Sequence, residues 1–195
     1  MAEPSSDGSK NVPREQNPWT RLGRETVYEN AWIRVYHDRV LRPDGLPGVY
    51  GVVHFRHRAV GVVALDHQQR VLLVGQYRYP LEQYSWEIPE GGAPLDEAPL
   101  ETARRELREE TGYVAHKWQE LLRAHLSNSA TDEEAICFLA RSLRAGKPEP
   151  EGSEELQMRW VPFEEALQMV FRGEITDGLS VLGLQRVALT RLGTV

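Results

Sequence analysis

Three glutamates, Glu106, Glu109 and Glu110, have the residue type and the spacing to take part in chemistry. Glu106 and Glu110 are four residues apart and Glu109 is three from Glu106, so a helix would project all three carboxylates from one side. Like charges stacked in this way destabilise an isolated helix by about 0.2–0.5 kcal/mol per pair. A positive group must therefore compensate for this cluster.

Two kinds of compensation are open. Arg104, Arg105 and Arg108 lie on the same segment and could form ion pairs on a solvated helix face, which would be a purely structural arrangement. Carboxylates clustered on a rigid scaffold are also the hard oxygen ligands that Mg²⁺ or Mn²⁺ prefers, and a bound cation would relieve their repulsion. The helix alone is compatible with both interpretations.

The sequence also bounds the helix that carries these glutamates. Pro99 is tolerated only near a helix start, and Gly112 stands where a left-handed C-terminal cap belongs, so the helix should end at about Thr111. The stripe opposite the glutamates is apolar: Leu100, Ala103 and Leu107. We therefore expect this helix to turn one face to the core and the other to a charged site.

Strand-like and helical patterns surround this segment. Strands are predicted at 32–36, 49–55, 60–65, 70–79, 134–140 and 156–161, and amphipathic helices at 163–172 and 179–192. The runs 60–65 and 70–79 are almost continuously apolar, as in central strands covered on both faces. The polar segment 1–18 should be a disordered tail, and the runs before residue 57 should form a small antiparallel sheet. The predicted fold class is α/β, with layers of helix and sheet.

Composition and charge argue against several classes of function. The 195-residue chain has a formal net charge of −6, which would repel nucleic acid. It has no apolar stretch of the roughly 20 residues that a membrane span needs. Cys137 is the only cysteine, and the amino-terminal segment lacks the apolar centre of a signal peptide. We therefore expect a cytoplasmic protein without nucleic-acid or membrane partners.

The segment from Gly91 to Tyr113 resembles the Nudix box, G-x5-E-x7-R-E-U-x-E-E-x-G-U, in which U is an apolar or bulky residue. The match holds at every position, with Leu107 and Tyr113 as U residues and these fixed residues: Gly91, Glu97, Arg105, Glu106, Glu109, Glu110 and Gly112. The flanking motifs at 86–92 and 173–178 resemble the branch of this family that hydrolyses ADP-ribose and nucleotide sugars.

The resemblance implies a Nudix-type α/β/α sandwich with a mixed sheet at 58–195. Before it, at 19–57, it implies a small antiparallel β subdomain that serves dimerisation and base stacking. The implied activity is Mg²⁺-dependent hydrolysis of the diphosphate bond of nucleoside-diphosphate sugars, giving a nucleoside monophosphate and a sugar phosphate. A specific ADP-ribose pyrophosphatase is the alternative. A non-catalytic binding module is disfavoured because no carboxylate of the box is missing.

The resemblance also assigns roles within the box. Glu106 and Glu110 would be direct ligands of Mg²⁺, or of Mn²⁺ as the alternative ion, and Glu109 a ligand or a water-positioning group. The backbone carbonyl of Glu90 would complete the metal shell. The structural residues of the box would be Gly91, Gly112 and the pair Glu97 and Arg105, which would hold the loop.

A general base is expected outside the box, because this branch often takes the proton of the attacking water on a downstream loop glutamate. The candidates are Glu151, Glu154 and Glu155, of which Glu154 aligns best with the branch pattern. Any one of them could equally be an exposed loop acid. The sequence therefore leaves the identity of the base open.

The resemblance points to Arg78 and Trp32 as candidates for substrate binding. Arg78 resembles the arginine that this branch directs at the diphosphate, and a guanidinium fork suits that anion. Trp32 lies where relatives stack an aromatic ring on the base, often across a dimer. The alternatives are an exposed arginine at a strand end and a tryptophan that belongs to the core or to an interface.

One position departs from the pattern of the ADP-ribose-specific members. They carry a proline sixteen residues after the second glycine of the box, where this chain has Asn128. Asparagine leaves the loop freer than proline does, and its amide could hydrogen-bond sugar hydroxyls. We therefore expect broader specificity, with Asn128 as a substrate-binding residue.

Overall fold

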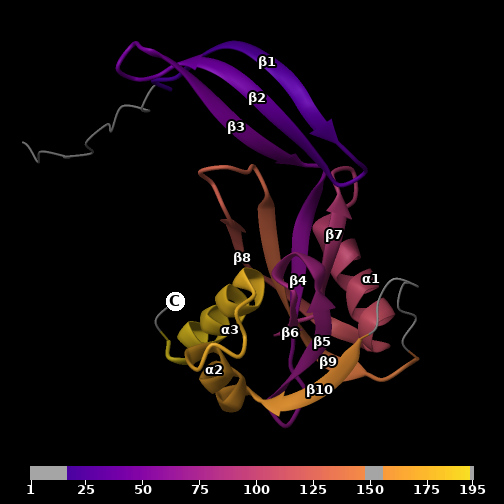
Figure 1. The fold of residues 1–195 in the computed structure, drawn as a ribbon. Helices are drawn as coiled ribbons and strands as arrows, with labels where there is room; N and C mark the ends of the chain where they lie inside the picture. The colour runs from indigo at the N-terminus through magenta and orange to yellow at the C-terminus, as the bar shows by residue number, and fades with distance from the viewer. Residues whose placement is uncertain (1–16, 148–155, 194–195) are drawn as a thin grey trace, which may run out of the picture.

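The computed structural model describes residues 17–147 and 156–193, which form three β-sheets and three α-helices (Figure 1). The strands are β1 (Thr20–Glu29), β2 (Ile33–Leu41), β3 (Pro47–Phe55), β4 (His57–Ala64), β5 (Arg70–Arg78), β6 (Gln83–Glu87), β7 (Glu90–Pro94), β8 (Val114–His125), β9 (Glu134–Arg144) and β10 (Gln157–Pro162). The helices are α1 (Pro99–Thr111), α2 (Phe163–Phe171) and α3 (Gly178–Arg191). The order of elements is that of an α/β protein with an added amino-terminal sheet.

The four-stranded sheet is mixed, as predicted. Its order is β7-β4-β9-β8, with β4 antiparallel to β7 and parallel to β9, and with β8 antiparallel to β9. A second sheet, in the order β10-β5-β6, is antiparallel throughout. Helix α1 lies on one side of these sheets and α2 and α3 lie on the other (Figure 1). The predicted α/β/α layering is therefore confirmed.

The alternation of side chains along β4 explains why both faces are covered. Val63 points to the core beneath α2 and α3, whereas Val60 and Val62 point to the core beneath α1. All three side chains are fully buried. Because successive strand residues face opposite sides, a nearly continuous apolar run fits only a strand that is covered on both faces.

Helix α1 begins at Pro99 and ends at Thr111, as predicted. Gly112 takes the left-handed conformation with φ 73°, and its N–H donates to the carbonyl of Arg108 at 2.7 Å. Ala103 and Leu107 are fully buried against the mixed sheet. This packing fixes the rotation of the helix and with it the direction of the glutamates.

Strands β1, β6, β7 and β8 have no counterpart among the predicted strands. Strand β8 is an edge strand, and most of its side chains are exposed, so its sequence lacks the apolar run that marks a central strand. Strands β6 and β7 are five residues each and overlap the two ends of the 86–92 motif. Their pairing with β5 and β4 is set by long-range contacts, which no local pattern reveals.

The amino-terminal sheet, in the order β1-β2-β3, stands apart from the other layers (Figure 1). Strand β3 continues into β4 with only Arg56 between them. Large exposed apolar side chains gather in this part of the chain: Trp19, Leu22, Val27, Tyr28, Trp32, Leu46 and Val49. Among the helices of the described residues, none has the length and apolarity to cross a membrane.

Candidate functional site

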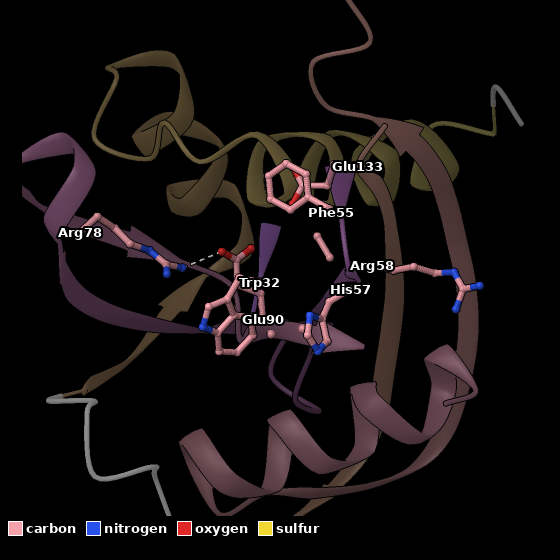
Figure 2. A pocket seen from close by; sticks show the side chains of 10 residues that line it. Trp32, Phe55, His57, Arg58, Arg78, Glu90 and Glu133 are labelled. Atoms are coloured by element: carbon pink, nitrogen blue, oxygen red, sulfur yellow. Dashed lines mark hydrogen bonds and ion pairs between the residues drawn. The ribbon is translucent and has the colours of Figure 1, made fainter. Parts of the chain in front are cut away.

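A pocket of about 240 Å³ lies where the amino-terminal sheet meets β4, β5 and β7. Figure 2 shows Arg78 approaching it from one side and the rings of Trp32 and His57 side by side near Glu90. Its lining combines aromatic rings with ionic groups: Trp32, Phe55, His57, Arg58, Ala59, Arg78, Glu90, Gly91, Gly92 and Glu133. Such a lining suits a ligand that has both a flat and an anionic part.

Two box glutamates contact the backbone at one edge of this pocket. A Cβ atom added to Gly91 would lie 2.2 Å from the carboxyl carbon of Glu106, so glycine is what lets this carboxylate approach so closely. The backbone N–H of Glu90 donates to Oε2 of Glu110 at 3.2 Å. Glu106 and Glu110 are both buried. The Glu90–Gly91 backbone therefore lies against both carboxylates at once.

Arg105 neutralises the outer part of this cluster. Its Nη1 lies 2.7 Å from Oε1 of Glu106 and 3.1 Å from Oε2 of Glu109. Its Nη2 donates to the carbonyl of Gly92 at 3.3 Å and lies 3.6 Å from Oε2 of Glu97. A single guanidinium thus holds the helix, the loop before it and strand β7 together.

Arg78 likewise neutralises two glutamates, Glu87 and Glu90, next to the pocket. Its Nε lies 2.9 and 3.0 Å from the two carboxylate oxygens of Glu87, and its Nη2 donates to Oε1 of Glu90 at 2.7 Å. Burial opposes the charge of Arg78, but its ion pairs with these two glutamates outweigh burial and raise its pKa. Glu87 is only 2 % exposed. Arg78 is therefore held by two carboxylates, and its Nη1 makes no hydrogen bond within the described residues.

Three further acids near the pocket were not identified from the sequence. Glu87 belongs to the 86–92 motif, and Asp177 caps α3 by accepting a hydrogen bond from Ser180 N at 2.7 Å. Burial and the charges of Asp177 and Glu87 raise the pKa of Glu90 well above its ordinary value. Burial and Asp177 also raise the pKa of Glu133. An N-cap pattern could have located Asp177, whereas nothing local distinguishes Glu133.

Trp32 lies at the mouth of the pocket. Trp32 is 61% exposed, and its ring centroid lies 4.9 Å from that of His57. A Cβ atom added to Gly92 would come within 3.4 Å of the Trp32 ring, so this ring sits directly over β7. An exposed indole in this position is available to stack on a flat ligand.

The other predicted site residues lie apart from this group. Asn128 is exposed in a turn and does not line the pocket, although the same loop leads to Glu133, which does. The candidate bases Glu151, Glu154 and Glu155 lie outside the described residues. The structure therefore brings together the box glutamates, Glu90, Arg78 and Trp32 but does not extend to the proposed base.

The chain matches two known family models. The sequence model of the NUDIX domain matches residues 55–178, and that of the nucleoside diphosphate sugar hydrolase N-terminal domain matches residues 19–53. This chain belongs to the Nudix family. The Nudix match contains the whole box and the strands around it, whereas the second match covers the amino-terminal sheet through most of β3.

Two characterised proteins and one solved structure illustrate what the chain is similar to. The chain is 34% identical over 182 residues to an ADP-ribose pyrophosphatase of Mycobacterium tuberculosis, covering 91% of this chain and 87% of that protein. It is 32% identical over 126 residues to a GDP-mannose pyrophosphatase of Yersinia enterocolitica, covering 59% of this chain and 64% of that protein. The crystal structure of an ADP compounds hydrolase shares the fold, with a TM-score of 0.80, 22% identity and coverage of 94% of this chain and 100% of that one.

Nudix hydrolases generally use divalent cations, and the donors of this chain fit one. Glu106, Glu110 and the carbonyl of Glu90 supply hard oxygen atoms beside one short stretch of backbone, as such ions require. Within residues 17–147 and 156–193, no three acidic, cysteine or histidine side chains already surround a common point. Arg105 pairs with the Glu106 carboxylate instead, whereas Arg78 pairs with the side chains of Glu87 and Glu90. A cation would thus compete with Arg105 for the Glu106 carboxylate.

The close contact at Gly91 gives the first prediction. Gly91→Ala should weaken divalent-cation binding about 10- to 100-fold, because the new methyl group would displace the Glu106 carboxylate. The displaced atoms are the end of a flexible side chain, so the free energy of unfolding should change by less than about 1 kcal/mol. Calorimetric titration with Mg²⁺ and denaturant unfolding measure the two effects.

Gly92→Ala is the matched control. A Cβ atom there would meet no atom closer than 3.4 Å, so cation affinity should stay near that of the wild type. Equal cation affinity in Gly91→Ala and the wild type would contradict the assignment of Glu106 to the metal site.

Proposed function

We propose that this Nudix hydrolase cleaves the diphosphate bond of nucleoside-diphosphate sugars with Mg²⁺ and releases a nucleoside monophosphate and a sugar phosphate. The observation that carries the proposal is the contact of Glu106 and Glu110 with the Glu90–Gly91 backbone, beside a pocket lined by Arg78 and Trp32. The names of its relatives, ADP-ribose pyrophosphatase and GDP-mannose pyrophosphatase, support the same class of substrate.

The electrostatics of a diphosphate explain the need for a cation. The negatively charged phosphates repel hydroxide, and a divalent ion held by Glu106, Glu110 and the Glu90 carbonyl would neutralise them and lower the pKa of the attacking water. Mn²⁺ is the alternative ion. Glu109 would position the water or add a ligand, and Glu154 or Glu151 would accept its proton.

Arg78 is the proposed diphosphate ligand. Glu87 and Glu90 take its Nε and Nη2, so one edge of the guanidinium is fixed and Nη1 can donate to a phosphate oxygen. A buried carboxylate that orients the arginine reduces the side-chain entropy lost when substrate binds. Glu87 would thus act through Arg78 as a positioning residue.

Trp32 and Glu133 supply the remaining contacts of the proposed complex. The exposed indole of Trp32 would stack on the base. Glu133 lines the same pocket and could accept hydrogen bonds from sugar hydroxyls. This distribution puts base and sugar recognition on two segments outside the box, which would let specificity vary without changing the metal ligands.

A specific ADP-ribose pyrophosphatase remains the second candidate. It is favoured by the relatives of that name in Mycobacterium tuberculosis and in Bacillus subtilis, the latter 32% identical over 171 residues. The same bond would be cleaved, so the two candidates differ only in how strongly one sugar is preferred. A cytoplasmic site of action is proposed for either, because the lone Cys137 cannot form an internal disulfide.

The reaction can be tested with a panel of nucleotide sugars, ADP-ribose, dinucleoside polyphosphates and nucleoside triphosphates in Mg²⁺, with products identified by mass. We expect a nucleoside monophosphate and a sugar phosphate from nucleotide sugars. Glu110→Gln should lower kcat by about 10²- to 10⁴-fold while the protein stays folded, because it removes a charged metal ligand. Glu101→Gln, an exposed glutamate on the same helix, should keep wild-type turnover.

Specificity can be tested at Asn128. At least one nucleotide hexose, such as ADP-glucose or GDP-mannose, should be hydrolysed with kcat/KM within about tenfold of ADP-ribose, a difference of about 1.4 kcal/mol. Asn128→Pro should raise kcat/KM for ADP-ribose relative to that for nucleotide hexoses. Proline fits the turn, because Asn128 has a negative φ and is the second residue of a turn closed by Ala130 N and Ser127 O at 3.0 Å.

Asn128→Ala separates the two effects of that substitution, since it removes the amide without fixing φ. If loss of the amide causes the shift in the kcat/KM ratio between ADP-ribose and nucleotide hexoses, Asn128→Ala and Asn128→Pro should shift it alike. A wild-type preference for ADP-ribose of a thousandfold or more over every nucleotide hexose would contradict broad specificity and leave the second candidate.

We also propose that the chain forms a homodimer through its amino-terminal sheet. Strand β1 is an edge strand with almost every residue exposed, and the sheet carries exposed aromatic and aliphatic side chains such as Val27, Tyr28 and Trp32. Light scattering at micromolar concentration should give twice the mass of the chain. A monomer mass under these conditions would refute this proposal.

A further inference from the structure

Asp132 joins the loop before β9 to the end of β3. Its Oδ1 accepts from the N–H of Phe55 at 3.0 Å, and its Oδ2 lies 2.5 Å from Nδ1 of His54. Its own N–H donates to the carbonyl of Val53 at 3.3 Å. One aspartate therefore contacts the last three residues of β3, where this strand leads into β4.

The Asp132 carboxylate is held in its ionised form. Burial opposes its charge, but the hydrogen bonds from His54 and from the Phe55 N–H outweigh burial and lower its pKa. An imidazole donates from Nδ1 both as a cation and in one of its neutral tautomers. The link between Asp132 and His54 therefore needs only a proton on Nδ1.

Asp132 connects two residues of the pocket that are far apart in the sequence. Phe55 and Glu133 both line the pocket (Figure 2), whereas Asp132 does not. Asp132 fixes Phe55 through a hydrogen bond that spans 77 positions of the chain, and it fixes Glu133 through the peptide bond between them. The two walls of the pocket are thus joined through this one side chain.

The other links of this loop lie farther from Glu133 or on its far side. The turn before Asp132 is bound to β3 through Ser129 and Ala130, whose carbonyls accept from Tyr50 and from Val53 N. After Glu133, the next residue, Glu134, pairs with Arg58 at 3.1 Å. Asp132 is therefore the side chain next to Glu133 that ties the segment to the amino-terminal sheet.

We propose that Asp132 is a positioning residue for sugar recognition, which holds Glu133 and the end of β3 in the arrangement that receives the sugar of the substrate. This inference rests on the sugar contact proposed above for Glu133. A carboxylate that accepts hydrogen bonds from sugar hydroxyls binds more weakly when its segment must first be ordered. Loss of Asp132 should therefore weaken substrate binding and leave the chemical step unchanged.

The test measures KM and kcat of Asp132→Ala and Glu133→Gln with the best nucleotide sugar. In both variants KM should rise about 5- to 20-fold while kcat stays within about twofold, because binding is lost without loss of transition-state stabilisation. The matching nucleoside diphosphate, which lacks the sugar, serves as a competitive inhibitor. Its inhibition constant should stay within about twofold of the wild type in both variants.

A double variant separates positioning from a general loss of structure. In the Glu133→Gln background, Asp132→Ala should change KM by less than about twofold, because the group through which Asp132 acts is already gone. A merely structural role would raise KM equally in both backgrounds. Asp132→Asn should fall between wild type and Asp132→Ala, since its amide oxygen can still accept from the Phe55 N–H.

Asp44→Ala is the matched control. Asp44 also accepts from a backbone N–H, that of Leu46 at 3.0 Å, and pairs with a cationic side chain, Arg42 at 2.7 Å. Its side chain is 54% exposed, against 49% for Asp132. It lies in the turn between β2 and β3, outside the pocket lining, so its KM should match that of the wild type.

Two results would overturn the proposal and can be told apart. If Glu133→Gln raises KM and Asp132→Ala does not, or if the two effects multiply in the double variant, Asp132 does not act through Glu133 and the proposed sugar contact stands. If Glu133→Gln leaves KM unchanged, the sugar contact itself is wrong and the inference fails with it.

Discussion

The architecture of the site depends on the mutual repulsion of carboxylates gathered around the Glu90–Gly91 backbone. Glu106 and Glu110 contact this stretch, and Glu87 and Glu90 lie beside it. Two unit charges 4 Å apart interact with about 4 kcal/mol at an effective dielectric constant of about 20, so an uncompensated cluster would destabilise the region. Arg105 and Arg78 supply the compensation from opposite sides. Because each guanidinium bridges separate segments, the same ion pairs that cancel the repulsion also join the elements of the site.

The elements around the cluster are arranged to keep it fixed. The N–H of Ile88 donates to the Ser180 hydroxyl at 2.9 Å, and the N–H of Val62 donates to the Pro89 carbonyl at 2.8 Å. The segment before the box is therefore tied both to α3 and to β4. A Cβ atom on Gly61 would come within 2.8 Å of Leu179, so α3 packs directly on the central strand. A rigid frame of this kind keeps the mutually repelling carboxylates in one geometry when a cation replaces an arginine as their partner.

Sequence patterns predicted the parts of this structure that depend on local chemistry. Pro99 and Gly112 bounded α1, and the apolar run at 60–65 identified a strand covered on both faces. The partners of Arg78 could not be predicted, because Glu87 and Glu90 come into its reach only when β5 pairs with β6 and the chain turns into β7. The position of Glu133 could not be predicted either, because its place in the pocket follows from the parallel pairing of β4 with β9. Hydrophobic periodicity and capping residues reveal helices and strands. Long-range packing decides which side chains come into contact.

The amino-terminal sheet connects the two ends of the proposed substrate site. The loop from Ser127 to Asp132 is bound to β3, because Val53 N donates to Ala130 O at 2.9 Å and the Tyr50 hydroxyl donates to Ser129 O at 2.7 Å. Asp132 further accepts from Phe55 N at 3.0 Å and lies 2.5 Å from Nδ1 of His54. This loop leads directly to Glu133, and the turn before β2 carries Trp32. A displacement of the sheet would therefore move the proposed base-stacking and sugar-binding residues together, while the proposed metal ligands on α1 stayed in place. Contacts that the sheet makes with a second copy of the chain would accordingly act on substrate recognition before they act on the chemical step.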